Sequence, residues 1–151
     1  SIYDKKAIPE DSLASILQVP GNIFNYKLLT SKKLERFINK GGEVHVRSVF
    51  IQGLILMPPH KIPNYLSKLV EPLKMFHSFC KNYDINPITL STSCIFKLVP
   101  KCKLVIGIDS IDQLNEIISK TNIEISNDII NKALKIGKQY SSNLWDPRNW
   151  N

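Results

Sequence analysis

The residues best suited to ligand chemistry in this sequence follow a strand-like apolar segment. Residues 43–50 carry valines at strand spacing and place a guanidinium and a hydroxyl near their far end, at Arg47 and Ser48. An amide and a glycine follow at Gln52 and Gly53, and a glycine lets the backbone approach a ligand closely. Charge, hydroxyl, amide and glycine at the end of a buried strand predict a binding site. The alternative is a strand followed by an ordinary turn.

The cysteines and histidines of this sequence predict neither a disulfide framework nor a metal site. An odd number of cysteines argues against a disulfide framework, so a reducing, cytoplasmic compartment is expected. The histidines are too dispersed to predict a zinc site. The residues concerned are Cys80, Cys94, Cys102, His45, His60 and His77.

Length and composition predict one globular domain, residues 1–151. The chain is 43% hydrophobic and 22% charged, which is typical of a globular protein with a buried core. Its net charge of +7 comes mainly from single lysines in the middle third, and spaced lysines favour solvated helix faces over a nucleic-acid interface. The longest apolar run, residues 49–57, contains Gln52, so no membrane span is expected.

Strands and helices must alternate to position these groups. A first helix is capped by Thr30 or Ser31 and ended by Gly41. An apolar stripe begins at Pro63, and Pro72 is expected to divide it into two helices because proline removes a backbone hydrogen bond. The predicted strands are residues 1–3, 16–19, 43–50 and 103–108.

The last third of the chain continues the alternation. Asn86 and Pro87 begin a helix, and residues 103–108 predict a strand covered on both faces. Ser110 and Gln113 have the spacing of a capping box for the next helix. A final helix spans residues 126–139. The apolar residues expected to face inward on the capped helix are Leu114, Ile117 and Ile118.

This order predicts an α/β fold with a parallel sheet of three whole strands and one remnant. A closed barrel needs eight strands. The sequence contains neither a glycine-rich dinucleotide fingerprint nor a phosphate-binding P-loop.

Four motifs in their order resemble the C-terminal half of an aldo/keto reductase, over essentially the whole chain. They are S-I-Y at 1–3, L-Q-V-P-x-N-I-F at 17–24, V-R-S-V-F-I-Q-G-L-I-L-M at 46–57 and V-I-G-I-D-S-x-x-Q-L at 105–114, and D-P-R-N-W closes the chain. The resemblance implies part of a (β/α)8 TIM barrel, from a strand-five remnant to strand eight. It also implies hydride transfer between NADP or NAD and a small carbonyl substrate, at the C-terminal ends of the strands.

The resemblance implies cofactor-binding roles for residues at several strand ends. Ser1 and Gln18 match residues that hydrogen-bond the nicotinamide carboxamide, although Gln18 also fits a buried strand amide. The residues that match the pyrophosphate loop are Ser48, Gln52, Gly53 and Leu54. Those that match the adenosine end are Gly107, Asp109, Ser110 and Gln113, of which Asp109 and Ser110 also fit a plain helix cap.

Three departures from the family pattern affect what the resemblance implies. Arg47 stands where many members have a tyrosine, so it is expected to stack on the nicotinamide, pair with an anionic group, or form a salt bridge in the barrel mouth. Ile2 replaces an asparagine that binds the carboxamide. Gly107 and Gln113 replace basic residues that hold a 2′-phosphate, which leaves NAD and NADP both open.

The family's catalytic Asp, Tyr, Lys and His would precede Ser1, so no catalytic residue is assigned and the chain alone is expected to be inactive. The N-terminal half of the barrel is therefore the expected partner. A half barrel also leaves open strand edges and an apolar interior. The sequence does not decide between a fragment and a natural truncated protein. It also leaves open the oligomeric state and the carbonyl substrate. The alternative function is a non-catalytic β/α binding or regulatory module.

Overall fold

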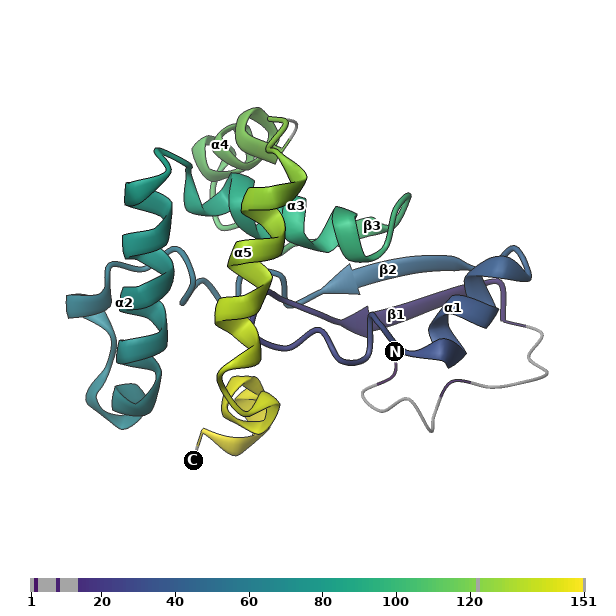
Figure 1. Cartoon of the computed structure of the whole chain (residues 1–151), viewed down its shortest axis with the longest axis horizontal. Coiled ribbons are helices and arrows are strands. Elements are labelled where there is room, and N and C mark those ends of the chain that lie inside the picture. The colour runs from purple at the N-terminus through teal and green to yellow at the C-terminus, as the bar shows by residue number, and fades with distance from the viewer. Residues whose placement is uncertain (1, 3–7, 9–13, 122, 151) are drawn as a thin grey trace.

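A three-stranded parallel sheet organises the fold (Figure 1). The computed structural model describes residues 2, 8, 14–121 and 123–150. The strands are β1 (Ile16–Pro20), β2 (Glu43–Arg47) and β3 (Lys103–Val105), and β2 lies between the other two. Val46 pairs with both Val19 and Leu104, so three of the predicted strand segments, at 16–19, 43–50 and 103–108, do lie together and parallel. Residues 1 and 3 of the predicted strand remnant lie outside the described residues.

Five helices accompany the sheet in the described part of the chain. They are α1 (Lys32–Asn39), α2 (Ser67–Asn82), α3 (Pro87–Leu98), α4 (Ile111–Thr121) and α5 (Asn127–Lys138). Short 3-10 turns are η2 (Pro59–Lys61), η3 (Asn64–Leu66), η4 (Ser142–Trp145) and η5 (Pro147–Asn149). In Figure 1, β1 and β2 run toward the side where α2 and α5 stand. The C-terminal strand ends, where a site was predicted, therefore point toward the later helices and the C-terminal segment.

Helix α1 begins and ends as its sequence predicts. Of the two candidate caps, Ser31 is the one used, and its side chain accepts a hydrogen bond from the N–H of Leu34. Leu34 and Phe37 are buried. The chain leaves the helix at Gly41, whose φ of 90° is the left-handed conformation that favours glycine.

Pro72 does not divide α2, which runs unbroken from Ser67 to Asn82, so that expectation was wrong. Proline removes only the hydrogen bond to the carbonyl of the residue four positions earlier. That residue is Lys68, which lies in the first turn and is exposed, so water can hydrate its carbonyl. The apolar stripe of Leu69, Leu73 and Phe76 is buried on both sides of the proline, and this burial stabilises the helix across it.

Helices α3 and α5 match their predictions. The side chain of Asn86 caps α3 by accepting from the N–H of Ile88. Ser126 caps α5, which packs against both α2 and α3. At Gly137 an added Cβ would lie 1.9 Å from the carbonyl oxygen of Ile23, so α5 touches the backbone that follows β1. This close approach ties the end of the chain to the beginning of the sheet.

Both later strands are shorter than predicted. β2 ends at Arg47, and the backbone then turns, so Val49 and Phe50 lie in a loop and not in the strand. β3 ends at Val105, and its faces are not both covered as expected, because Lys103 and Val105 are exposed on one face and Leu104 is only half-buried on the other. Among the described residues, no strand pairs with the outer edge of β3.

Helix α4 also buries less than expected. Ile117 is only 6% exposed, but Leu114 and Ile118 face outward, which corrects their predicted inward position. We use the name β3–α4 surface for the exposed apolar residues of β3, of α4 and of the segment between them. Its members are Val105, Ile108, Ile111, Leu114 and Ile118.

The two faces of the sheet differ in polarity. Val44 and Val46 of β2 point to the buried side, whereas Glu43, His45 and Arg47 alternate to the other side. The open face is therefore polar and charged along β2, whereas Ile16 of β1 and Val105 of β3 are exposed apolar residues on the same face. The fold is α/β with a small parallel sheet. Across the residues described, none of the helices combines the length and the apolarity needed to cross a bilayer.

Candidate functional site

The loop that follows β2 has an unusual backbone. Ser48, Ile51, Gln52 and Gly53 have φ values of 62°, 51°, 53° and 82°. A β-branched residue such as isoleucine is strained in this region. Ile51 is almost fully buried, so its apolar contacts offset part of that strain. Packing of Ile51 thus fixes the loop in a conformation that the backbone alone disfavours.

A cleft of about 300 Å³ lies between this loop and the residues that follow β3. Both walls stand at the C-terminal ends of neighbouring parallel strands, where α/β proteins commonly bind ligands. Six of the residues predicted from the sequence line the cleft. They are Ser48, Gln52, Gly53, Gly107, Asp109 and Gln113.

The cleft offers backbone N–H groups at its loop wall. Among hydrogen bonds between described residues, none takes the backbone N–H of Gln52 or Gly53 as its donor. An added Cβ at Gly53 or Gly107 would meet no atom within 4 Å, so both glycines leave open space beside the backbone. Free N–H groups next to open space are what a phosphate oxygen requires from a loop.

The opposite wall is the N-terminal end of α4. Ser110 Oγ accepts from the N–H of Gln113 at 3.1 Å, and Gln113 Oε1 accepts from the N–H of Asp109 at 2.8 Å. The predicted cap therefore forms, except that the glutamine reaches Asp109 rather than Ser110. Asp109 and Gln113 nevertheless line the cleft, so a cap and a ligand contact are compatible at these two residues.

Gln18 and Arg47 do not line this cleft but lie on the open face of the sheet. Gln18 pairs in register with His45, and Arg47 lies two residues further along the same strand. Both side chains therefore stand on one face near the ends of adjacent strands. Nη1 of Arg47 donates to Ser48 Oγ at 3.3 Å, which connects the sheet face to the cleft wall.

The remaining predicted residues fall elsewhere. Leu54 is buried beneath the loop, where it supports the cleft without lining it. Ser110 caps α4. Ser1 lies outside the described residues, but the N–H of its neighbour Ile2 donates to the carbonyl of Gln18 at 3.0 Å. That bond places Ile2 beside β1.

Sequence reasoning missed a polar cluster at the other end of β2. Glu43 contacts His45 on its own strand and Lys103 on β3, the latter at 2.8 Å. The hydrogen bond from Lys103, followed by that from His45, lowers the pKa of Glu43. Lys103 is distant in sequence, so only the pairing of His45 with Lys103 reveals the cluster. It joins β2 to β3 and lies at the strand end opposite the cleft.

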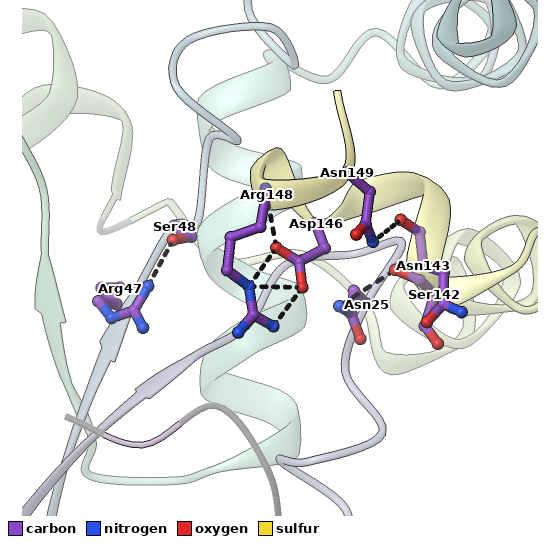
Figure 2. Close-up of polar contacts among 8 residues, drawn as sticks. All are labelled: Asn25, Arg47, Ser48, Ser142, Asn143, Asp146, Arg148 and Asn149. Atoms are coloured by element: carbon purple, nitrogen blue, oxygen red, sulfur yellow. Dashed lines mark hydrogen bonds and ion pairs between the residues drawn. The ribbon is translucent and has the colours of Figure 1, made fainter. Parts of the chain in front are cut away.

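The C-terminal segment also contributes groups that were not predicted. Figure 2 shows Asp146 and Arg148 on the segment near Arg47 and Ser48. Nε of Arg148 donates to both carboxylate oxygens of Asp146, at 2.8 and 3.0 Å. The hydrogen bond from Arg148 lowers the pKa of Asp146, and the charge of Arg47 adds to that effect. The D-P-R-N-W motif was noted in the sequence, but nothing in its composition showed where it would lie.

Metal and thiol chemistry find no support in the described residues. No group of three or more His, Cys, Asp or Glu side chains gathers there to hold a metal ion. The three thiols are free and buried, and burial raises the pKa of Cys80 and Cys94 to about 12 and that of Cys102 to about 11. Such thiols remain protonated and act as small apolar groups.

Comparison with known proteins adds no assignment: no family model matches the sequence, and no curated protein matches it.

Proposed function

We propose that this chain is the cofactor-binding half of an NAD(P)H-dependent carbonyl reductase of the aldo/keto reductase type. The cleft at the ends of β2 and β3 carries the proposal, because residues assigned to the cofactor from two distant motifs line one cavity. Gln52 and Gly53 are at least 54 positions from Gly107 in the sequence. In the fold all three residues line the same cleft.

Each wall suits a different part of a dinucleotide. The N–H groups of Gln52 and Gly53 receive the pyrophosphate, and the missing side chains at Gly53 and Gly107 let it approach. Asp109 and Gln113 supply acceptors for ribose and adenine groups. Gln18, on the open sheet face, is directed to the nicotinamide carboxamide. The bound cofactor would supply hydride to the carbonyl carbon of a small substrate.

The charge within the cleft bears on the choice between NAD and NADP. Asp109 repels a 2′-phosphate, and the basic residues that would hold one are replaced by Gly107 and Gln113. Both observations favour NAD over NADP. The buried, protonated thiols agree with a cytoplasmic setting for the reaction.

The proposed partner is the N-terminal half of the barrel, which would bring the catalytic residues. The β3–α4 surface supports this, because five large apolar side chains beside an outer parallel strand require cover. Parallel strands in the sequential order β1-β2-β3 are also what one arc of a (β/α)8 barrel contains.

The second candidate function is a non-catalytic binding module. The positions of two tyrosines favour this function for the chain without an N-terminal half. Tyr26 donates its hydroxyl to the carbonyl of Leu134, and burial raises its pKa. The hydroxyl of Tyr140 lies 2.8 Å from Met75 Sδ. Neither tyrosine is placed to act as a general acid in the cleft.

Cofactor binding by the chain itself tests the proposal. We expect the fluorescence of NADH or NADPH to change on titration, with dissociation constants below about 1 mM. Gln52→Glu places a negative charge against the pyrophosphate and should weaken binding about tenfold or more. Gln139→Glu makes the same change at an exposed position beyond α5 and should have no effect.

Reaction with aldehydes separates the two candidates. With an N-terminal half supplied, loss of absorbance near 340 nm on adding simple aldehydes supports the reductase. Dinucleotide binding without turnover over a broad aldehyde panel supports the binding module. Absence of dinucleotide binding by both the chain and the reassembled protein would refute the cofactor site.

A further inference from the structure

A cavity of about 390 Å³ lies between the turn that joins α2 to α3 and residues 123–126, which precede α5. In Figure 1 this region lies toward α4 and away from the C-terminus. Its volume is within the range of small-molecule sites. None of the described residues that line it also lines the cleft between β2 and β3. A ligand bound here is therefore distinct from the dinucleotide proposed above.

The walls of this cavity are fixed by hydrogen bonds within the chain. Thr89 Oγ1 donates to the carbonyl of Lys120 at 2.8 Å, which fastens the end of α4 to α3. The N–H of Ile85 donates to the carbonyl of Cys80 at 2.9 Å and so holds the turn after α2. The side chain of Ser126 caps α5 at the opposite wall. A cavity that exists before the ligand arrives needs little ordering when the ligand binds.

One part of the lining is apolar. Ile85, Ile125 and Ile129 are half-buried and pack against the hydrophobic core, so each keeps part of its surface accessible. Tyr83 adds an aromatic ring that is held against Phe79, with 4.5 Å between the ring centroids. Such a surface favours an apolar group on the ligand.

Charged residues of both signs complete the lining. They are Asp84, Glu124 and Lys120. Within the part of the chain that the structure describes, none of these three side chains forms an ion pair or a hydrogen bond. The neutral polar side chains of the lining already bond within the protein; they are Asn86, Thr89 and Ser126. The polar groups left for a ligand are therefore two carboxylates and one ammonium.

We propose that this cavity binds a zwitterionic α-amino acid with an apolar side chain. The carboxylates of Asp84 and Glu124 accept hydrogen bonds from the ammonium of the ligand, and the ammonium of Lys120 donates to its carboxylate. The isoleucines cover its side chain. A ligand with both charges satisfies both signs of charge at the cavity, whereas a simple cation or anion satisfies one. This assignment does not depend on the proposed reductase function.

Leucine and three analogues test each part of the assignment. Isopentylamine lacks the carboxylate of leucine, isocaproate lacks its ammonium, and glycine lacks its side chain. Binding to the unaltered chain is followed by the NMR shifts of the backbone amides of Ile85 and Ile125, at one fixed pH and ionic strength. We expect leucine to bind with a dissociation constant below about 1 mM, and each analogue to bind at least about tenfold more weakly. Absence of leucine binding, or an analogue that binds as tightly as leucine, would overturn the proposal.

Matched variants assign the two charges separately. Lys120→Met removes the ammonium but keeps the length of the side chain, so it should bind leucine only as tightly as the unaltered chain binds isopentylamine. Asp84→Asn with Glu124→Gln should bind leucine only as tightly as the unaltered chain binds isocaproate. Lys135→Met and Glu116→Gln make the same chemical changes at exposed positions outside the lining and should have no effect.

A solvated surface without a specific site gives a different pattern. If the variants of the lining change the affinities for leucine, isopentylamine and isocaproate by one common factor, the charges act on no particular group of the ligand, and the proposal is wrong. Melting temperatures are recorded for every variant. The comparison of leucine with its analogues uses the unaltered chain, so it decides the proposal even where a variant does not fold.

Discussion

Trp145 lies flat against Phe24, with ring centroids 3.9 Å apart and planes inclined by 10°. Phe24 follows β1, and Trp145 belongs to η4 near the end of the chain. Phe76 of α2 meets the edge of the Phe24 ring, at 6.1 Å between centroids. Two aromatic contacts of Phe24 thus join the segment after β1 to α2 and to the segment that carries Asp146 and Arg148.

Replacing Trp145 tests this contact. Trp145→Ala should lower the free energy of unfolding by about 3–5 kcal/mol, because a fully buried ring is lost. Trp145→Phe should cost less, about 1–2 kcal/mol, because the indole Nε1 has no hydrogen-bond partner among the described residues. Urea unfolding measures both. Equal losses for the two variants would show that the ring stack contributes little.

Substitution of two glycines in the cleft distinguishes the effect of backbone strain from the effect of filling the space for a ligand. Gly53→Ala should cost about 1–2 kcal/mol of stability, since alanine must adopt a φ of 82°. Gly107→Ala should cost less than about 0.5 kcal/mol, because its Cβ enters open space. Both variants should weaken NADH binding, measured by fluorescence. Unchanged binding in both would place the dinucleotide outside this cleft.

Stability should fall in mild acid because of His77. Burial lowers the pKa of His77 below its ordinary value of 6.5, an effect that the carbonyls of Ile55 and Met57 partly oppose. The unfolded chain then binds the proton more readily than the folded one, so the free energy of unfolding falls as pH drops below 6.5. His77→Gln should reduce this fall between about pH 7 and pH 5.

His60 provides the control for that measurement. It is exposed in η2, so His60→Gln should leave the pH dependence of the urea midpoint as it is in the unaltered chain. A pH dependence in His77→Gln equal to that of the unaltered chain would assign the acid sensitivity to other groups.

The β3–α4 surface should tolerate charge in the isolated chain. Ile111 is 76% exposed and Ile118 is 55% exposed, so Ile111→Lys with Ile118→Lys should change the free energy of unfolding by less than about 1 kcal/mol. The double variant should self-associate less in sedimentation velocity and should fail to assemble with an N-terminal half. Ile117→Lys, at a buried position on the same helix, should unfold the chain.

The sequence predicted most local structure correctly because those signals are short in range. Ser31, Asn86 and Ser126 each cap a helix through atoms within three residues, and no distant contact is needed to read them. The parallel strands also followed from the alternation of elements. The cleft could be anticipated because parallel strands bring their C-terminal ends to one edge.

The failures share a dependence on distant neighbours. Pro72 was read as a break, but the buried stripe around it keeps α2 whole. The apolar residues of 103–108 predicted a covered strand, yet composition does not say whether the covering element belongs to this chain. Tertiary packing, which no local pattern encodes, brings Lys103 to Glu43. It also brings Arg148 near the end of β2.

The left-handed turn at Ile51 has a consequence for evolution as much as for binding. Because the buried side chain of Ile51 keeps that turn in shape, the exposed residue Gln52 can change without dismantling the loop. Since buried packing fixes the shape of the loop, substitution of exposed residues in the cleft would change its ligand preference with little loss of folding stability.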